Sequence, residues 1–230
     1  MLKNYFRLCD SCRLTVVLVL ALAANTCVSA HADLLVTSRE SNSVVRFTDS
    51  GNYIGVFIAG NTLDLTANAA LNGGLVGPIG IATRPGDDNH IYVLSSGLTQ
   101  TGLSSNESSI LKYNRTTGAH VETIATGGNL ADSSDLLFDA SGNAYVSNFW
   151  NLNANFHGDV VKFGSDDSPL GPFATLPNPT GAVVMAFGPN NDLFVSSFLE
   201  NSIYRFDGTT GDQIGAGAFA MGLGGDNASG

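Results

Sequence analysis

Two short sequence patterns recur four times in the same order, and this repetition restricts the possible folds more than any other feature of the chain. The first pattern is a β-branched and aromatic run that ends in a small polar residue, with central valines 57, 53 and 49 residues apart. It reads LLVTS at 34–38, IYVLS at 91–95, AYVSN at 144–148 and LFVSS at 193–197. The second pattern has a small polar residue, two apolar residues, a basic residue and an aromatic residue. It reads SVVRF at 43–47, SILKY at 109–113, DVVKF at 159–163 and SIYRF at 202–206.

Turn-forming residues separate these runs from further apolar segments. Asn, Asp, Ser and Gly tolerate left-handed backbone or bond their own amides, and they follow each second pattern, for example at 48–52 and 207–211. A further run follows, as at 53–58 and 121–125, and another precedes the first pattern in three units, at 79–83, 136–138 and 183–187. Each unit is therefore predicted to be an antiparallel meander of four strands. We call them a, b, c and d in chain order, where b and c are the two recurring patterns.

A single four-stranded sheet cannot bury both of its faces, so such units have to stack on one another. Radial stacking of four-stranded sheets gives a β-propeller, whereas two packed sheets of short strands give a β-sandwich. The fixed period and constant strand order favour an all-β propeller, with blades at about 33–60, 79–126, 134–177 and 183–220. Because residue 33 leads directly into strand b, the first blade is expected to lack its innermost strand. No segment shows a sustained helical period, so almost no helix is expected outside the N-terminal segment.

The number of predicted blades leaves two arrangements open. The chain can be a piece of a larger propeller, or it can form a small open or four-bladed ring, since propellers have typically four to eight blades. In many propellers the far end of the chain supplies the missing strand and removes the exposed edge. Residues 221–230 (MGLGGDNASG) do not complete such a strand, and we therefore favour the first arrangement.

The first 32 residues have the pattern of a secretory signal peptide. Lys3, Arg7 and Arg13 precede an apolar run at 14–24, and the small-x-small pattern at 30–32 predicts cleavage after Ala32. The run is shorter than the roughly 20 residues that a membrane-spanning helix needs, which makes an uncleaved anchor the weaker interpretation. The mature protein is therefore expected to be secreted or periplasmic, without a membrane anchor.

Cysteine positions and charge exclude several classes of function for the rest of the chain. All three cysteines (Cys9, Cys12 and Cys27) lie in the predicted signal, so residues 33–230 have no disulfide, thiolate metal site or cysteine nucleophile. Outside the predicted signal, 7 Lys and Arg stand against 19 Asp and Glu. This acidic balance argues against nucleic-acid partners and against anionic membrane surfaces.

The blade motifs resemble those of known propellers. The segment GPIGIA at 77–82, with IYV at 91–93 and SILKY at 109–113, resembles an NHL repeat. The last unit, from NPTG at 178–181 through LFV at 193–195 to IYRF at 203–206, resembles both NHL repeats and the gluconolactonase-like propellers of the six-bladed type. This resemblance implies blades rather than a particular reaction.

The resemblance to gluconolactonase-like propellers also implies where metal ligands would lie. Those proteins carry metal-binding acids and amides near the ends of their b strands. This chain has Ser at three of the four corresponding positions and lacks the Glu-Gly-Pro opening of that family. An inherited metal lactonase site is therefore not expected.

The connections of the meander differ between the two faces of the predicted propeller. The a–b and c–d turns are short, whereas the b–c and d–a connections include the long segments 61–77, 97–108 and 149–158. Long loops on a rigid scaffold commonly carry binding residues. The candidate binding residues on this loop face are the b-strand ends Ser38, Ser95, Asn148 and Ser197, together with Trp150, His157, Phe198 and Glu200.

Two functions fit these candidates. Aromatic side chains beside a histidine and a carboxylate can stack on a sugar or another flat ligand, although the same loops can instead pack only against neighbouring blades. The first hypothesis is an exported binding or scaffold module for a protein or a glycan, with no evident catalytic set. The second is a metal-dependent hydrolase or lyase of the lactonase-like propeller type, with Asn148, His157 and Glu200 near one rim.

The sequence identifies no cofactor, although it leaves a divalent ion such as calcium open. Acidic and amide residues at 87–89, 166–167 and 190–192 offer the oxygen ligands that calcium prefers. Each cluster falls where a hairpin turn is required, and its spacing matches no calcium loop. Turn formation therefore explains these residues without a metal.

Overall fold

The computed structural model describes residues 33–60, 72–97, 108–151, 157–177 and 181–222, and its elements in these ranges are all β strands. In this part of the chain no helix is long and apolar enough to span a membrane. The predicted signal peptide, residues 1–32, lies outside the described residues, as do the greater part of the first two long loop segments and residues 152–156 of the third.

The strands form four separate antiparallel sheets, each with its strands in chain order. Blade 1 has three strands: β1 (Leu34–Ser38), β2 (Ser43–Phe47) and β3 (Tyr53–Ala59). Blade 2 comprises β4 (Pro78–Ala82), β5 (His90–Ser95), β6 (Ser109–Asn114) and β7 (His120–Thr126). Blade 3 comprises β8 (Ser133–Phe138), β9 (Ala144–Asn151), β10 (His157–Phe163) and β11 (Pro169–Thr175). Blade 4 comprises β12 (Ala182–Phe187), β13 (Asp192–Ser197), β14 (Ser202–Asp207) and β15 (Ala220–Met221).

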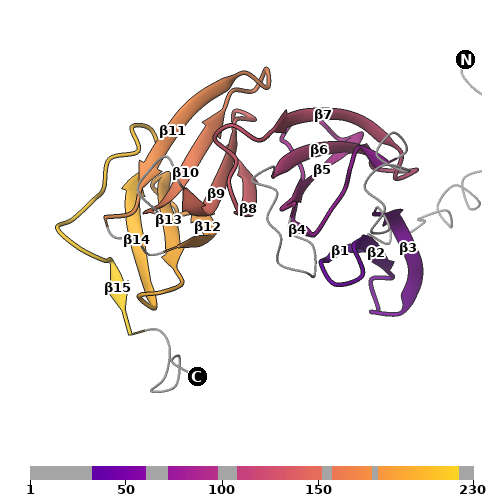
Figure 1. The fold of residues 1–230 in the computed structure, drawn as a ribbon, viewed down its shortest axis with the longest axis horizontal. Helices are drawn as coiled ribbons and strands as arrows, with labels where there is room; N and C mark the ends of the chain where they lie inside the picture. Colours follow the sequence, from indigo (N-terminus) through magenta and orange to yellow (C-terminus); the bar gives the residue numbers. More distant parts are fainter. Residues whose placement is uncertain (1–32, 61–71, 98–107, 152–156, 178–180, 223–230) are drawn as a thin grey trace, which may run out of the picture.

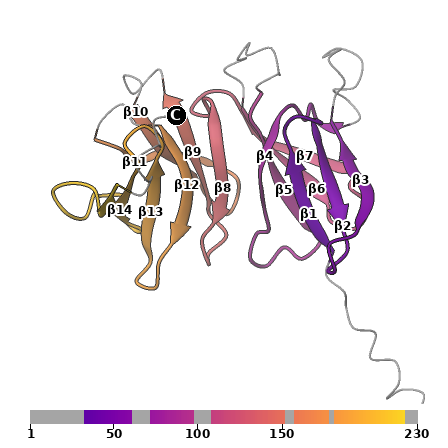
Figure 2. The same cartoon turned by 90° about the horizontal axis from the view of Figure 1, so that it is seen from below.

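The predicted all-β propeller and the missing innermost strand of blade 1 are confirmed. The blades lie side by side along an arc, with blade 1 and blade 4 at its two ends (Figure 1). The innermost strands β4, β8 and β12 contact one another in turn, and β1, the first strand of blade 1, contacts β4. Figure 2 shows that the strands of all four blades run between the same two faces of the molecule.

The hydrophobic core lies between neighbouring blades. In blade 2, Ile91 and Val93 of strand b pack in the cluster shared with blade 1, whereas Tyr92 and Leu94 pack in the cluster shared with blade 3. All four side chains are at most 3% exposed. An inner blade buries both of its faces, which explains why strand b is a continuous apolar run without the alternation of a one-sided sheet.

The basic residue of strand c has the same structural role in every blade. It lies opposite strand b in the ladder, so that in blade 3 Lys162 is paired with Tyr145. From there its cationic group reaches the face of an aromatic ring, within the roughly 6 Å over which cation–π attraction acts. The four contacts are Arg46 over Phe57 (5.8 Å), Lys112 over Tyr92 (5.8 Å), Lys162 over Tyr145 (4.9 Å) and Arg205 over Phe194 (6.0 Å). The recurring basic residue of the sequence repeat therefore links neighbouring strands within each blade.

Candidate functional site

The four b-strand ends predicted as a polar ring occupy equivalent places in the four sheets. Each is paired with the first residue of the second pattern across the ladder, in the pairs Ser38–Ser43, Ser95–Ser109, Asn148–Asp159 and Ser197–Ser202. The structure therefore places them along one edge of the blades. Ser38 is partly exposed, but Ser95, Asn148 and Ser197 are at most 3% exposed. Three of the four side chains thus face the protein interior.

Asn148 uses its full hydrogen-bonding capacity inside the protein. Its Nδ2 donates to the carbonyl of Asn129 (2.7 Å) and to Oδ1 of Asp159 (2.8 Å). Its Oδ1 accepts from Oγ of Ser133 (2.7 Å) and from the N–H of Ala131 (3.2 Å). Asn148 and Asp159 are 0% and 1% exposed. This network ties strands a, b and c of blade 3 to the segment that enters the blade.

Backbone hydrogen bonds hold the same edge together in blades 2, 3 and 4. The N–H of the residue after each predicted b-strand end donates to the carbonyl of the residue immediately before strand a of the same blade. These bonds run from Ser96 to Gly77 (3.1 Å), from Phe149 to Asp132 (2.9 Å) and from Phe198 to Gly181 (3.0 Å). In blade 2, Oγ of Ser95 also donates to the carbonyl of Val76 (2.8 Å) and accepts from its N–H (2.9 Å). The rim of the loop face is therefore a fixed framework.

Strand b of blade 3 is longer than the sequence suggested. β9 continues to Asn151 and β10 begins at His157, so Trp150 and His157 belong to strands and not to a long loop. The ladder continues because a register shift between His157 and Asp159 lets His157 pair with Asn151. The structure describes the backbone of Trp150 and His157 but not their side chains. Their role in binding therefore stays a prediction.

Phe198 is the most exposed aromatic side chain in the described part of the chain, at 64%. It begins the b–c turn of blade 4, where the next residue, Leu199, is 49% exposed. The ring of Phe149, from blade 3, meets the ring of Phe198 edge to face with centroids 5.7 Å apart. Phe198 and Leu199 therefore form an exposed apolar patch, which we call the Phe198 patch, on a turn that is fixed to two blades.

Glu200, the third candidate in this turn, is engaged with its own blade. Its carboxylate accepts a hydrogen bond from the hydroxyl of Tyr204, and its carbonyl accepts one from Oγ of Ser202 (2.9 Å). Glu200 follows Phe198 by two positions in the b–c turn of blade 4. Its carboxylate is held by strand c of the same blade.

The acidic clusters considered as calcium ligands take part in turns and contacts between strands. Asp166 Oδ1 accepts bonds from the N–H (3.2 Å) and Oγ (2.6 Å) of Ser168 within the c–d turn. Asp87 accepts bonds from the Tyr92 hydroxyl (2.8 Å) and pairs with Nδ1 of His90 (2.7 Å). Burial tends to raise the pKa of Asp87, but these bonds outweigh it and hold the pKa below its usual value. Within the described ranges, no three His, Cys, Asp or Glu side chains lie close enough together to hold a metal ion.

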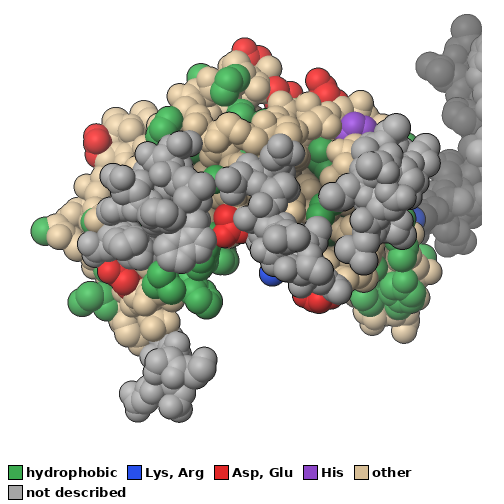
Figure 3. Space-filling model, viewed as in Figure 1, with side chains coloured by type: hydrophobic (Ala, Val, Ile, Leu, Met, Phe, Trp, Pro, Cys, Tyr) green, Lys and Arg blue, Asp and Glu red, His purple; other side chains and the backbone are tan. Residues whose placement is uncertain are grey.

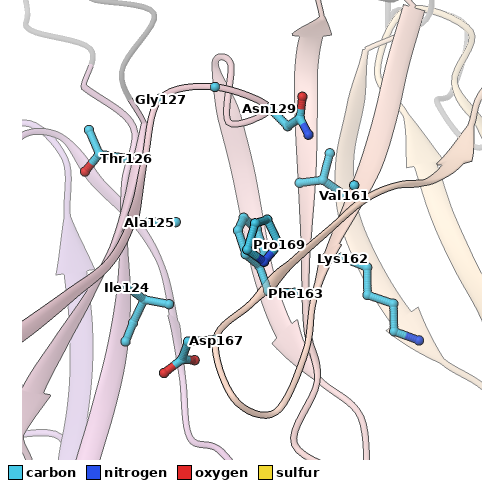
Figure 4. Close-up of a pocket in the computed structure, with 12 residues that line it drawn as sticks. Ile124, Ala125, Thr126, Gly127, Asn129, Val161, Lys162, Phe163, Asp167 and Pro169 are labelled. Carbon is cyan, nitrogen blue, oxygen red and sulfur yellow. The ribbon is translucent and has the colours of Figure 1, made fainter.

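A cleft of about 360 Å³ lies between the outer strands of blades 2 and 3 (Figure 4). Ile124 and Ala125 form one wall, and Val161, Phe163 and Pro169 form the other. Two of its polar lining residues have partners, since the Thr126 hydroxyl contacts that of Ser109 (3.0 Å) and the Asp167 carboxylate pairs with Arg84. The sequence did not predict this cleft, because the size of the cleft depends on the distance between blades 2 and 3. Beside its apolar walls, the cleft is lined by the polar residues Thr126, Asn129, Lys162 and Asp167.

No protein-family model matches the chain. No curated protein sequence matches it either. The fold is nevertheless similar to that of solved structures. A nidogen in complex with laminin superimposes with a TM-score of 0.55 at 14% sequence identity, over 80% of this chain and 58% of that one. A catalytically inactive virginiamycin B lyase from Staphylococcus aureus, determined with quinupristin, superimposes with a TM-score of 0.54 at 14% identity, over 84% of this chain and 53% of that one.

A third similar structure is a candidate gluconolactonase, with a TM-score of 0.53 at 13% identity, over 83% of this chain and 60% of that one. The chain thus matches little more than half the length of these three proteins. Sequence identities this low show the fold alone. The three similar structures confirm the propeller architecture that the blade motifs implied. They include both binding proteins and enzymes.

Proposed function

We propose that this protein is an exported binding module that holds a partner protein on its loop face through the Phe198 patch. The observation that carries the proposal is the 64% exposure of Phe198 on a turn that is fixed by a backbone hydrogen bond and by the ring of Phe149. A small number of aromatic residues supply most of the energy of a typical protein interface. A side chain that is already held in place loses little conformational entropy on binding.

The neighbour of Phe198 favours a protein partner over a glycan. Leu199, which is 49% exposed, offers an aliphatic surface that suits an apolar side chain. A sugar stacks on the face of an aromatic ring and gains little from a leucine. The nidogen structure with the same fold is a complex with laminin, so this architecture is able to present a protein-binding surface.

Replacing the patch should abolish most of the binding. We expect Phe198→Ala combined with Leu199→Ser to weaken the affinity for the partner by about tenfold or more, since each truncation removes an apolar anchor worth roughly 1 kcal/mol. The partner is first captured from extracellular or periplasmic extracts on the immobilised protein and identified, and its affinity is then measured by calorimetry. Leu170→Ser is the matched control, because Leu170 is 57% exposed on β11, away from the patch.

Equal capture by the patch variant and by the control would contradict the proposal. The same two variants are applied to a glycan array. Binding to the array that depends on Phe198, without capture of a protein, would identify a glycan as the ligand and refute the proposed protein partner.

The alternative is a metal-dependent lactonase-like hydrolase or lyase, and thermal unfolding separates it from a binding module. A resident metal at about 100 times its Kd stabilises a protein by roughly 2.7 kcal/mol, which corresponds to a rise in Tm of roughly 5–10 °C for a chain of this size. Asn148 has no unused donor or acceptor to offer a metal. We therefore expect millimolar calcium, magnesium, zinc or manganese to leave the Tm unchanged. A rise within the stated range would favour the enzyme.

A further inference from the structure

Blade 1 exposes positions that are buried in every other blade. We call the side of a blade that packs on the preceding blade its incoming face, and the opposite side its outgoing face. Strand b contributes two apolar residues to the incoming face. In blades 2, 3 and 4 these two residues are 3% or less exposed. The pairs are Ile91 and Val93 in blade 2, Ala144 and Val146 in blade 3, and Leu193 and Val195 in blade 4. The equivalent residues of blade 1, Leu34 and Val36, are 56% and 38% exposed.

Blade 4 has the complementary exposure on its outgoing face. Ile203 is the strand c residue of this face in blade 4, and it is only partly buried. Its equivalents in blades 1, 2 and 3 are 0% exposed, namely Val44, Ile110 and Val160. Phe219 and Val184 on the same blade are 58% and 59% exposed. Figure 3 shows hydrophobic side chains gathered over both end blades of the arc.

The c–d turns show the same difference between blade 1 and the other blades. In blade 2, a Cβ on Gly118 would lie 2.5 Å from the carbonyl oxygen of Phe57 on blade 1. In blade 4, a Cβ on Gly211 would lie 1.9 Å from the carbonyl oxygen of Phe173 on blade 3. At Gly51, in the corresponding turn of blade 1, nothing lies within 4 Å. Among the described residues, the incoming face of blade 1 thus lacks the neighbouring blade against which the other blades pack.

We propose that a second copy of this chain covers these faces, with blade 4 of one copy packed on blade 1 of the other. The outgoing face of blade 4 has the same residue pattern as the outgoing faces that pack on blades 2, 3 and 4 within the chain. Within the described part of the chain, each copy offers one incoming face and one outgoing face on which no other blade packs. A two-fold axis therefore satisfies both at once and closes an eight-bladed ring, within the four to eight blades typical of propellers.

The interior blades identify which residues meet in this interface. At every contact between blades, the strand c residue equivalent to Ile203 belongs to the same cluster as the strand b residue equivalent to Val36. These pairs are Val44 with Val93, Ile110 with Val146, and Val160 with Val195. Ile203 of one copy is therefore expected to lie against Val36 of the other.

Analytical ultracentrifugation of the purified full chain over a wide range of concentrations tests this assembly. We expect a species of twice the chain mass. Val36→Asp and Ile203→Lys should each convert it to a monomer, because each places an unpaired charge in an apolar interface. Val121→Asp and Leu170→Lys are the matched controls and should leave the dimer intact, since these side chains are 49% and 57% exposed on the outer strands of blades 2 and 3.

Mixing the two monomeric variants gives the decisive measurement. Val36→Asp and Ile203→Lys should together restore a dimer, because one interface then contains an opposite-charge pair and the other contains the unchanged residues. Misfolded variants cannot give this rescue. A wild-type monomer at all concentrations would overturn the proposal and would leave these faces to further blades from another source. A dimer that only one of the two variants disrupts, or a mixture that stays monomeric, would also overturn it.

Discussion

Asn148→Ala is expected to lower the free energy of unfolding by about 3 kcal/mol or more. The substitution removes four hydrogen bonds at a site with no access to water, since Asn148 is 0% exposed. The Ser133 hydroxyl, the Ala131 N–H and the Asn129 carbonyl each lose their bond to Asn148. The Asp159 carboxylate, which is 1% exposed, also loses one partner. Uncompensated buried polar groups each cost about 1–3 kcal/mol, and charged groups cost more. Urea unfolding followed by circular dichroism measures the change.

Ser95→Ala is the matched control for this prediction, because Ser95 occupies the equivalent place in blade 2. Its Oγ makes two hydrogen bonds, both to the backbone of Val76. We expect a loss of about 1 kcal/mol. If Asn148→Ala is no more destabilising than Ser95→Ala, the network around Asn148 has no special structural role, and its side chain becomes available again as a candidate ligand.

The fold could be predicted from the sequence because each blade repeats the same local requirements. The run IYVLS at 91–95 is apolar at consecutive positions because blade 2 is covered on both sides, by Val44 of blade 1 and by Val146 of blade 3 among others. The basic residue of strand c recurs because it always meets an aromatic ring of its own blade. Such short-range rules leave a direct trace in the spacing of residue types.

The candidate site was less predictable, because its geometry depends on contacts between distant segments. The sequence indicates Asn148 at a strand end, but only the structure shows that Asn129 and Ala131 pass close enough to use both sides of its amide. The extension of β9 to Asn151 depends on a register shift in the opposite strand, which has no sequence signal of its own. The sequence indicates a turn at Phe198, whereas the exposure of Leu199 depends on which side of that turn faces solvent.

Arg84 is the second residue whose replacement should have a large effect on stability. It lies in the a–b turn of blade 2 and forms an ion pair with Asp167 in the c–d turn of blade 3. Its guanidinium also lies over the rings of Tyr92 (4.6 Å) and Phe138 (4.9 Å), one from each blade. The side chain is 10% exposed, so it connects two blades in a largely dry environment.

We expect Arg84→Ala to lower the free energy of unfolding by about 2–3 kcal/mol, because it removes packing against two rings and leaves Asp167 without its cation. Arg84→Met should stay within about 1 kcal/mol of the wild type. Methionine keeps most of the packing volume and contacts aromatic rings favourably. It also removes the buried Nε, which has no hydrogen-bond partner. Urea unfolding measures both variants, with Arg115→Ala in an exposed turn as the control for loss of a positive charge.

The two Arg84 variants distinguish packing from charge as the source of the link between blades 2 and 3. If Arg84→Met is as destabilising as Arg84→Ala, the ion pair with Asp167 makes the larger contribution, and raising the salt concentration should then weaken the wild type towards the variants. If Arg84→Met is close to the wild type, packing of the residue 84 side chain between Tyr92 and Phe138 is sufficient to link the two blades. We expect the second result, because a guanidinium whose Nε is buried and unpaired has already lost part of its hydration without full compensation.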